Sequence, residues 1–267
     1  MSDICLIGAG KMGEAMLNAW IGSDKVDPGG VVICERDEAR RAEVAQRYGV
    51  SQAETGEAGA SGARIVVLAV KPQDSKSVLD SIKDELGADS ILMSIAAGLT
   101  ISSIRRSVGG EPSVIRVMPN IGAHVSASIS AYTVDDGAAG LDVEGAIGLL
   151  EAIGESVEVP EESMNLVTAI SGSGPAYFFL MVEALERVGV AHGLDDEVAR
   201  ALARESLWGA ARVLKETGRE AAELREAVSS PGGTTLAALG VFEEGGFMQL
   251  VKEAVVAARI RAGELAR

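Results

Sequence analysis

The chain has 267 residues, of which 47% are hydrophobic, and its formal net charge at pH 7 is -15. This length and apolar content suffice for one large folded domain or two ordinary ones, and they argue against a disordered chain. The negative charge disfavours binding to nucleic acid or to anionic membranes, because the phosphates of both would repel it.

The two cysteines, Cys5 and Cys34, each stand within a short apolar run. This placement favours buried, reduced thiols over a redox role. No basic leader precedes an apolar stretch, and no uninterrupted apolar segment is long enough to span a bilayer. We therefore expect a cytoplasmic protein without a membrane partner.

Up to about residue 160, short β-branched runs alternate with amphipathic stretches. This alternation predicts βα units around a largely parallel sheet whose two faces are both covered by helices. The expected strands cover residues 4–7, 31–34, 65–70, 90–95, 114–118, 129–134 and 156–159. Residues 1–160 are therefore interpreted as one α/β domain.

Beyond Pro160 the strand signals vanish, and a separate all-helical domain is expected over residues 161–267. A helix is predicted to begin near Pro175, and its opening residues 176–182 are apolar on every side. A helix without a polar face must be enclosed, so we expect subunit association, with a core helix of a single chain as the alternative. Asp195 is expected to cap the next helix, which ends at Gly218.

The first expected strand runs directly into a glycine-rich turn that opens a helix. In Rossmann-type folds the first glycine permits a tight turn, the second leaves room for a pyrophosphate, and the third lets helix and strand pack closely. Backbone amides at the helix start then face the anion. We therefore predict an oxidoreductase with a nicotinamide dinucleotide site at Gly8, Ala9, Gly10, Lys11, Met12 and Gly13.

Glu35 and Arg36 follow the second strand, where such folds distinguish NAD from NADP. A carboxylate there accepts both ribose hydroxyls and repels a 2′-phosphate, which favours NADH. Arg36, Arg40 and Arg41 could hold that phosphate, which favours NADPH. The two signals conflict, and Arg40 and Arg41 can equally be a solvated helix start.

Two further motifs follow strands at the same edge, since ligands of open α/β sheets bind beyond the carboxyl ends of the strands. Ala69, Val70, Lys71 and Pro72 end the third expected strand, and Asn120 follows the fifth. We expect Lys71 and Asn120 to border the nicotinamide. Ordinary loop chemistry, with a proline ending each strand, is the alternative.

In the helical half, residues 171–177 and 229–235 are rich in serine, glycine and proline and run into apolar helices. Turns and helix caps explain both stretches: Ser171 to Gly174 and Pro231-Gly232 could make turns, and Ser173 or Thr234 could cap a helix. The exposed amides and hydroxyls at a helix start suit a substrate carboxylate equally well.

The sequence lacks several kinds of catalytic chemistry. His124 and His192 are far apart and have no neighbouring metal-ligand pattern, so neither a metal site nor a histidine-based triad is expected. The helix from Pro175 has no lysine near its start, which removes the base that β-hydroxyacid dehydrogenases of this architecture use. A substrate whose carbon is already activated, such as a protonated cyclic imine, needs only positioning and charge complementarity.

Together these motifs resemble the pyrroline-5-carboxylate reductase family over nearly the whole chain, and residues 228–238 are the most specific element. The resemblance implies reduction of 1-pyrroline-5-carboxylate to L-proline, the last step of proline biosynthesis, with NAD(P)H and usually NADPH. It implies a Rossmann domain followed by a helical domain that interlocks two subunits, often within a ring of dimers. An imine or ketone reductase for another small carboxylate and a non-catalytic redox sensor are the alternatives.

Carried over residue by residue, the resemblance places Thr235 beside the ring nitrogen of the substrate, on a loop from the partner subunit. Thr235, Lys71 and Asn120 are the catalytic candidates. The substrate-binding residues that the resemblance implies are Ser171, Gly172, Ser173, Gly174, Ser230, Gly232, Gly233, Thr234 and Thr235. Many members have Asn-Arg where this chain has Glu35-Arg36, so the choice between NADPH, which the family favours, and NADH stays open.

Overall fold

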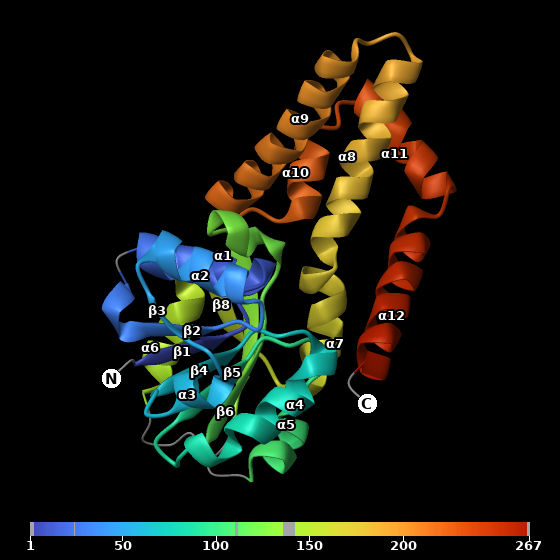
Figure 1. Cartoon of the computed structure of the whole chain (residues 1–267). Helices are drawn as coiled ribbons and strands as arrows, with labels where there is room; N and C mark the ends of the chain where they lie inside the picture. The colour runs from blue at the N-terminus through green and yellow to red at the C-terminus, as the bar shows by residue number, and fades with distance from the viewer. Residues whose placement is uncertain (1–2, 24, 110–111, 136–141, 266–267) are drawn as a thin grey trace. The chain divides into compact units, whose positions relative to one another are not determined.

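The computed structural model describes residues 3–23, 25–109, 112–135 and 142–265 (Figure 1). The chain forms two compact units. The sheet unit comprises Met1–Gly172 with Ala258–Arg267, and the helical unit comprises Ser173–Ala257. The boundary between the units follows Gly172, whereas the composition of the sequence changes after residue 160; a domain boundary at residue 160 stays a prediction.

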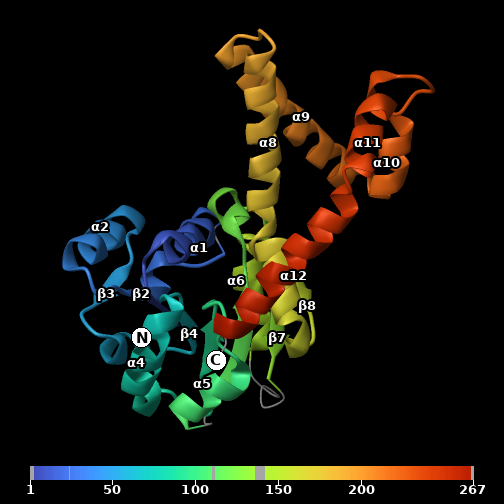
Figure 2. The same ribbon diagram turned by 90° about the vertical axis from the view of Figure 1, so that its right-hand side faces the viewer.

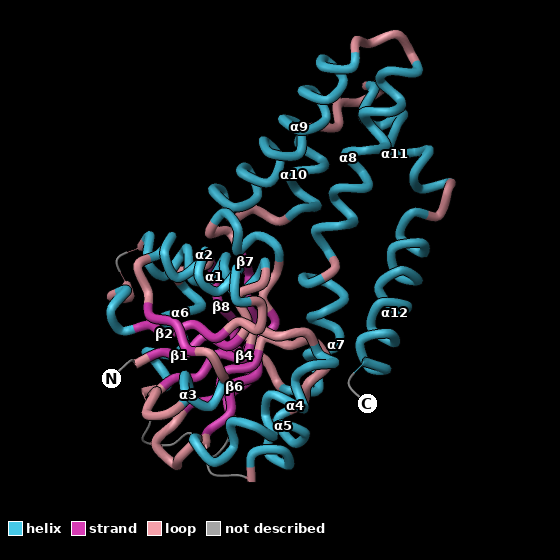
Figure 3. Tube along the Cα trace, viewed as in Figure 1, coloured by secondary structure: helices cyan, strands magenta, loops and turns pink. Residues whose placement is uncertain are grey.

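Within the described residues, eight strands form one sheet in the order β3-β2-β1-β4-β5-β6-β7-β8. Strands are drawn in magenta in Figure 3. All neighbours from β3 to β6 pair in parallel, β7 is antiparallel to β6, and β8 is parallel to β7. The strands are β1 (Ile4–Ile7), β2 (Val31–Cys34), β3 (Ser51–Ala53), β4 (Ile65–Leu68), β5 (Ile91–Ser94), β6 (Ser113–Met118), β7 (Ser128–Val134) and β8 (Gly154–Glu158). The predicted fold, a Rossmann-type largely parallel sheet followed by helices, is confirmed.

The seven strands expected from the sequence are all present, and their ends differ from the expected ones by at most two residues. The additional strand, β3, has the sequence Ser-Gln-Ala, and its residues are exposed or half-buried. It lies at the edge of the sheet and has no apolar run, so hydrophobic periodicity could not reveal it.

Two hydrophobic cores cover the two faces of the sheet. On one face, Ile4 and Leu6 of β1 pack with residues of three helices: α1 (Lys11–Gly22), α2 (Glu38–Tyr48) and α6 (Val143–Glu151). Trp20 of α1 is fully buried there and donates its indole N–H to the Leu149 carbonyl at 2.8 Å. On the other face, Cys5 and Ile7 pack with α3 (Gly56–Ala60), α4 (Pro72–Ile82) and α5 (Ile101–Val108). The sheet unit therefore buries both faces of its strands, as a parallel sheet requires.

Residues 161–172 continue the sheet unit with the short helix α7 (Met164–Val167) and a π-helical turn (Thr168–Gly172). The helical unit then contains α8 (Gly174–Ala191), α9 (Asp196–Thr217), α10 (Ala221–Ala227) and α11 (Thr234–Glu244), and the last helix is α12 (Phe247–Leu265). Asp195 caps α9 by accepting the Glu197 N–H, and α9 ends at Gly218, which has a φ of +61°. Both ends of α9 agree with the prediction.

Helices α8 and α9 form an antiparallel hairpin (Figure 2). A β-carbon added to Gly189 would lie 3.1 Å from the Ala199 β-carbon, and Arg204 pairs with Glu186 at 3.2 Å. Large apolar side chains of the hairpin nevertheless stay exposed, among them Phe178, Phe179, Leu180 and Trp208. Among the described residues 173–257, the buried apolar side chains are those of Ala199 and Ala203. The helical unit therefore lacks a core of its own.

One helical stretch, Glu161–Ala191, is long and apolar enough to cross a membrane by length and composition, with a mean hydropathy of 1.2 in its 18-residue window. This corrects the expectation that no segment reaches that length. The Ser171 to Gly174 stretch, expected as a turn, instead continues the helical path through the π-helical turn and joins two apolar segments. The core helix of a soluble protein can pass the same test, and exposed apolar side chains are also what subunit association requires.

Candidate dinucleotide and substrate site

Three glycines shape the turn between β1 and α1, and the structure separates their roles. Gly8 has a φ of +99°, and a β-carbon there would lie 2.7 Å from the Ala69 carbonyl oxygen. A β-carbon on Gly13 would lie 2.1 Å from the Gly8 carbonyl oxygen. A β-carbon on Gly10, however, would meet no heavy atom within 4 Å. Packing within the protein explains Gly8 and Gly13, while the space beside Gly10 fits a ligand such as a pyrophosphate.

The helix starts at the predicted motifs lack side-chain caps. Elsewhere, side chains accept hydrogen bonds from the first N–H groups of α2, α3, α5, α6 and α9. At α1, α4, α8 and α11, the capping positions are Gly10, Lys71, Ser173 and Gly233, and none makes such a bond. The short helices α7 and α10 are also uncapped. Uncapped N–H groups at a helix start carry partial positive charge and can bind an anion.

A cavity of about 510 Å³ lies at the carboxyl ends of β1, β2 and β4. Main-chain hydrogen bonds bring these ends together: Gly8 N–H donates to the Cys34 carbonyl and Ala69 N–H to the Ile7 carbonyl, both at 2.8 Å. The predicted cofactor residues that line the cavity are Gly8, Gly10, Glu35, Arg36, Ala69, Val70 and Lys71. The predicted residues Ala9, Lys11, Met12, Gly13, Pro72 and Asn120 do not line it.

Several lining residues were not predicted from the sequence. Glu54 and Gly56 follow the edge strand β3, which the hydrophobic pattern does not reveal. Asp74, Val78 and Ser81 lie on α4. Their spacing places them on one side of this helix, and that periodicity after the Lys71-Pro72 motif was the available signal.

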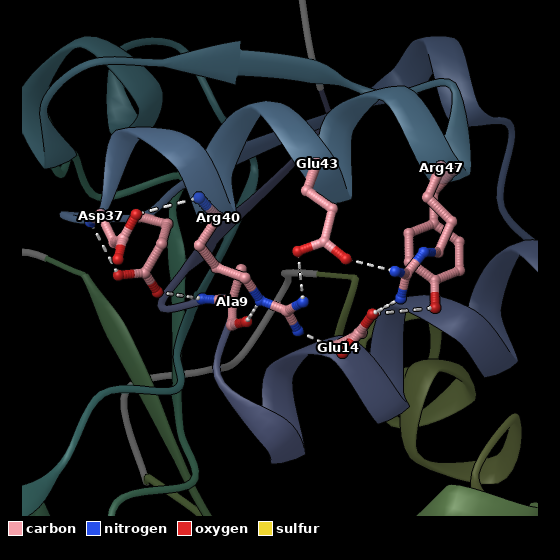
Figure 4. Close-up of polar contacts among 8 residues, drawn as sticks. Ala9, Glu14, Asp37, Arg40, Glu43 and Arg47 are labelled. Atoms are coloured by element: carbon pink, nitrogen blue, oxygen red, sulfur yellow. Dashed lines mark hydrogen bonds and ion pairs between the residues drawn. The ribbon is translucent and has the colours of Figure 1, made fainter.

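The start of α2 carries a network of charged side chains beside the glycine turn (Figure 4). The Glu35 carboxylate accepts hydrogen bonds from the N–H groups of Ala9 at 2.9 Å and Asp37 at 3.2 Å. Arg40 reaches from α2 toward α1, where it pairs with Glu14. The charge at the end of β2 is therefore held in place by main-chain donors.

Lys71 lines the cavity, whereas Asn120 does not. Lys71 is exposed and lines the cavity at the start of α4, where Pro72 takes the first helical position. Asn120 follows β6, and its side-chain oxygen accepts the Gly122 N–H at 2.9 Å. That bond leaves the amide nitrogen of Asn120 as the group able to donate to a ligand. A β-carbon on Gly172 would lie 2.6 Å from Met118, so the π-helical turn packs near the end of β6.

In the helical unit, Ser230 to Thr235 form a turn that opens α11. Gly232 has a φ of +70°, and the Gly233 N–H donates to the Ser230 carbonyl at 2.9 Å. Thr234 is the first residue of α11 rather than its cap, and Ser173 makes no capping bond at α8. The interpretation of Ser173 or Thr234 as a side-chain cap is therefore wrong. The uncapped start of α11 keeps its N–H groups available to a carboxylate.

Both cysteines are buried free thiols, as predicted. The sulfur atoms of Cys5 and Cys34 lie 3.8 Å apart. The hydrogen bond with Cys34, together with burial, raises the pKa of the Cys5 thiol and keeps it protonated. In the described part of the chain, no group of three or more His, Cys, Asp or Glu side chains is arranged to hold a metal ion.

Two family models match this chain. The model described as pyrroline-5-carboxylate reductase dimerisation covers residues 161–265, and the one described as NADP oxidoreductase coenzyme F420-dependent covers residues 3–98. The pyrroline-5-carboxylate reductase of Corynebacterium melassecola is 38% identical over 270 residues and covers 100% of both chains. The chain belongs to the pyrroline-5-carboxylate reductase family.

Solved structures of pyrroline-5-carboxylate reductases share the fold along the whole chain. The structure from Coxiella burnetii has a TM-score of 0.93 and 33% identity, and it covers 100% of this chain and 99% of its own. A Plasmodium falciparum pyrroline carboxylate reductase structure with NADP bound has a TM-score of 0.89 and 27% identity, with 100% and 98% coverage. The resemblance found in the sequence motifs is therefore confirmed.

Membership in the pyrroline-5-carboxylate reductase family also bears on the exposed apolar helices. The dimerisation model covers α8 and α9, where Phe178, Phe179, Leu180 and Trp208 are exposed in the single chain. Such side chains would be costly to leave in water, since their burial contributes about 1.5 to 3 kcal/mol each. Association between subunits is a direct way to bury them.

Proposed function

We propose that this protein reduces 1-pyrroline-5-carboxylate to L-proline, the last step of proline biosynthesis, with a nicotinamide dinucleotide as reductant. The observation that carries the proposal is the presence of two uncapped helix starts, one in each unit, in a chain that matches these reductases over its full length. The start of α1 at Gly10 fits a pyrophosphate, and the start of α11 at Gly233 fits a carboxylate. The substrate and the reductant are thus both recognised as anions.

The residues of the sheet unit hold the cofactor. Main-chain N–H groups at the start of α1 bind the pyrophosphate beside Gly10, and Glu35 lies at the ribose end of the cavity. Lys71 and Asn120 border the nicotinamide. A reduced nicotinamide held there would supply the hydride for the imine carbon.

The residues of the α11 turn hold the substrate. The N–H groups of Gly232 and Thr234 and the Ser230 hydroxyl donate to its carboxylate, and Gly233 lies beside it with its own N–H bonded to the Ser230 carbonyl. The stretch from Ser171 to Gly174 borders the ring. The Thr235 hydroxyl forms a hydrogen bond with the ring nitrogen and orients the imine. The protonated imine carbon is already electrophilic, so no side chain has to form a covalent bond or act as a base toward an alcohol.

The active protein is a homodimer with interlocked helical domains, in the cytoplasm, and a ring of such dimers is the larger assembly. The turn from Ser229 to Thr235 completes the site of the partner subunit. Exposed apolar side chains on α8, α9, α11 and α12 support this arrangement, since a single chain leaves them in water.

A steady-state assay tests the proposal directly. The full chain is mixed with pyrroline-5-carboxylate and with NADH or NADPH, and cofactor oxidation and proline formation are followed together. Stoichiometric formation of proline is expected. Cofactor binding without oxidation would instead indicate a sensor, and oxidation only with other imines or ketones would indicate a different small carboxylate as substrate.

A further inference from the structure

The end of β2 carries a negative charge that the main chain holds in place. Glu35 follows β2 directly and lines the cavity. The Ala9 N–H, in the glycine turn, donates to one of its carboxylate oxygens at 2.9 Å, and the Asp37 N–H donates to the other at 3.2 Å. Because each oxygen has its own donor, the carboxylate stays beside the turn, where this fold places the adenosine ribose.

Arg40 of α2 contacts the glycine turn, and its guanidinium already pairs with acidic side chains. Its Nη1 pairs with Glu43 at 3.0 Å, its Nη2 pairs with Glu14, and its Nε donates to the Ala9 carbonyl at 3.3 Å (Figure 4). The hydrogen bonds to Glu14 and Glu43 raise the pKa of Arg40. A second arginine, Arg47, shares Glu14 at 2.5 Å. The charge of Arg40 is therefore balanced within the protein.

The other two arginines of this region differ in their access to the cavity. Arg41 donates from Nη1 to the Glu35 carbonyl at 2.9 Å, and its Nε is buried without a hydrogen-bond partner in the described residues. Arg41 does not line the cavity, and its hydrogen bond supports the main chain of Glu35. Arg36 is exposed and lines the cavity, and the carboxylate residues Glu35 and Glu54 line it as well. Among the described lining residues that follow β2 and β3, there are thus one cation and two anions.

We propose that Glu35 makes this site select NADH over NADPH. The inference rests on the proposed function only in requiring a nicotinamide dinucleotide in this cavity. A ribose 2′-hydroxyl donates a hydrogen bond to the Glu35 carboxylate. A 2′-phosphate carries a charge of about -2 and brings that charge against Glu35. The preference is therefore opposite to the NADPH preference that the resemblance implies.

Calorimetric titration of the full chain with NADH and with NADPH, without substrate, tests the selection. We expect the Kd for NADH to be at least about tenfold lower than the Kd for NADPH at low salt, since the unfavourable contact between like charges occurs with NADPH alone. ADP and 2′,5′-ADP serve as probes of the adenosine end and should show the same order. Equal or tighter binding of NADPH or 2′,5′-ADP would overturn the proposal.

Two variants test whether Glu35 is the residue that sets the preference between NADH and NADPH. Glu35→Gln keeps an acceptor for the Ala9 N–H and removes the charge, so the Kd for NADPH should fall by about tenfold while that for NADH rises a few fold. Arg36→Gln is the matched control and should weaken both dinucleotides by similar factors. If Arg36→Gln weakens NADPH selectively and Glu35→Gln leaves the preference unchanged, Arg36 sets the specificity and the proposal is wrong.

A third variant covers the case in which Glu35→Gln does not fold, which circular dichroism and the melting temperature will show. Glu14→Gln does not change a cavity residue and releases Arg40 from one of its carboxylates. We expect the NADPH affinity to rise by about threefold and the NADH affinity to stay unchanged, because Arg40 then opposes the charge of Glu35. An unchanged ratio of affinities would count against the proposal. Preferential NADH binding without turnover of pyrroline-5-carboxylate would refute the proposed function alone, and turnover with preferential NADPH binding would refute this inference alone.

Discussion

The sheet unit and the helical unit both contain many apolar side chains, but they differ in how far the single chain buries them. The sheet unit buries its strands under helices on both faces, and side chains as large as Trp20, Leu79 and Ile104 are almost fully enclosed. In the helical unit, the buried apolar side chains of the described residues are alanines, while Phe178 and Phe179 are more than half exposed. The first unit completes its own core, whereas the described residues of the second unit bury no large apolar side chain.

This difference explains why the motifs of the two units carry different information. Contacts inside the sheet unit determine the glycine turn, because a β-carbon on Gly8 or Gly13 would overlap neighbouring main-chain atoms. In the turn from Ser230 to Thr235, Gly232 has a φ of +70°, and a β-carbon on Gly233 would lie 2.5 Å from the Ser230 Oγ. The residues of this turn are otherwise exposed or half-buried, and α11 begins without a side-chain cap. Turn geometry therefore explains the two glycines, whereas packing within the single chain does not explain Ser230, Thr234 and Thr235.

The largest effect should come from placing a charge on the exposed apolar side of α8. In a symmetric dimer, Phe179→Asp changes both subunits, so it should weaken their association by about 3 kcal/mol or more. Pyrroline-5-carboxylate reductase activity at nanomolar protein concentration should then fall by about 100-fold. Sedimentation velocity and the steady-state assay measure the two effects.

Ser77→Asp is the matched control for this variant, because it introduces the same side chain at an exposed position of α4 in the sheet unit. It should leave association and folding unchanged. A stable, fully active monomer of the wild-type protein would remove the need for a shared core, and the contrast between the two units would fail.

Two substitutions in the glycine turn separate packing from ligand binding. Gly13→Ala should lower the free energy of unfolding by about 3 kcal/mol, because its β-carbon would overlap the Gly8 carbonyl at 2.1 Å. Gly10→Ala should change that free energy by less than about 1 kcal/mol and weaken dinucleotide binding by about tenfold. Urea unfolding and calorimetric titration measure the two quantities. Equal losses of stability in both variants would contradict the separation.

The sequence was most informative where local patterns and tertiary structure require the same residue. Apolar runs located seven strands, and the ends of α9 at Asp195 and Gly218 followed from capping rules. The strand β3 was not found because it is short, polar and paired at the sheet edge. The stretch from Ser171 to Gly174 was expected as a turn, yet it continues the helical path as a π-helical turn, which local propensity does not distinguish.

Residues of the candidate site could be predicted from the sequence only where they belong to a recognisable motif. Residues from three strand ends, such as Gly10, Glu35 and Lys71, were found because glycine spacing and strand order bring them together. Glu54 was not predicted because β3, the strand that precedes it, was not predicted. Asp74 was not predicted because its role depends on which side of α4 faces the cavity. The hydrogen bond that fixes Glu35 to Ala9 depends on the close approach of two chain segments, which no local pattern specifies.

Thr235 tests whether the exposed turn of the helical unit takes part in the reaction. Thr235→Val preserves the shape of the side chain and removes the hydroxyl, so kcat/KM should fall by an amount equivalent to about 1 to 3 kcal/mol. The melting temperature should stay within about 2 °C of the wild type, since the residue is not buried in the single chain. Thr235→Ser should restore most of the activity. Kinetics of Thr235→Val that equal those of the wild type would refute the assigned role.

The smallest expected effect concerns the end of the sheet unit, where composition and structure place the boundary differently. Glu161 follows Pro160, yet its carboxylate pairs with the buried Arg116 of β6 at 3.1 Å and accepts the Ile101 N–H of α5 at 2.7 Å. Glu161→Ala should therefore destabilise the protein by about 1 to 2 kcal/mol, less than for a fully buried pair because Glu161 retains 32% side-chain exposure.

Glu161→Gln keeps both acceptor contacts and should cost less than about 1 kcal/mol, whereas Glu162→Ala, at an exposed neighbouring position, should cost nothing measurable. Urea unfolding monitored by far-ultraviolet circular dichroism gives the three values. A free energy of unfolding that is lowest for Glu161→Ala, intermediate for Glu161→Gln and highest for the wild type would show that the sheet unit depends on residues beyond 160. If Glu161→Ala and Glu162→Ala were equally stable, Arg116 would not need its partner, and the composition change at residue 160 would be the better boundary.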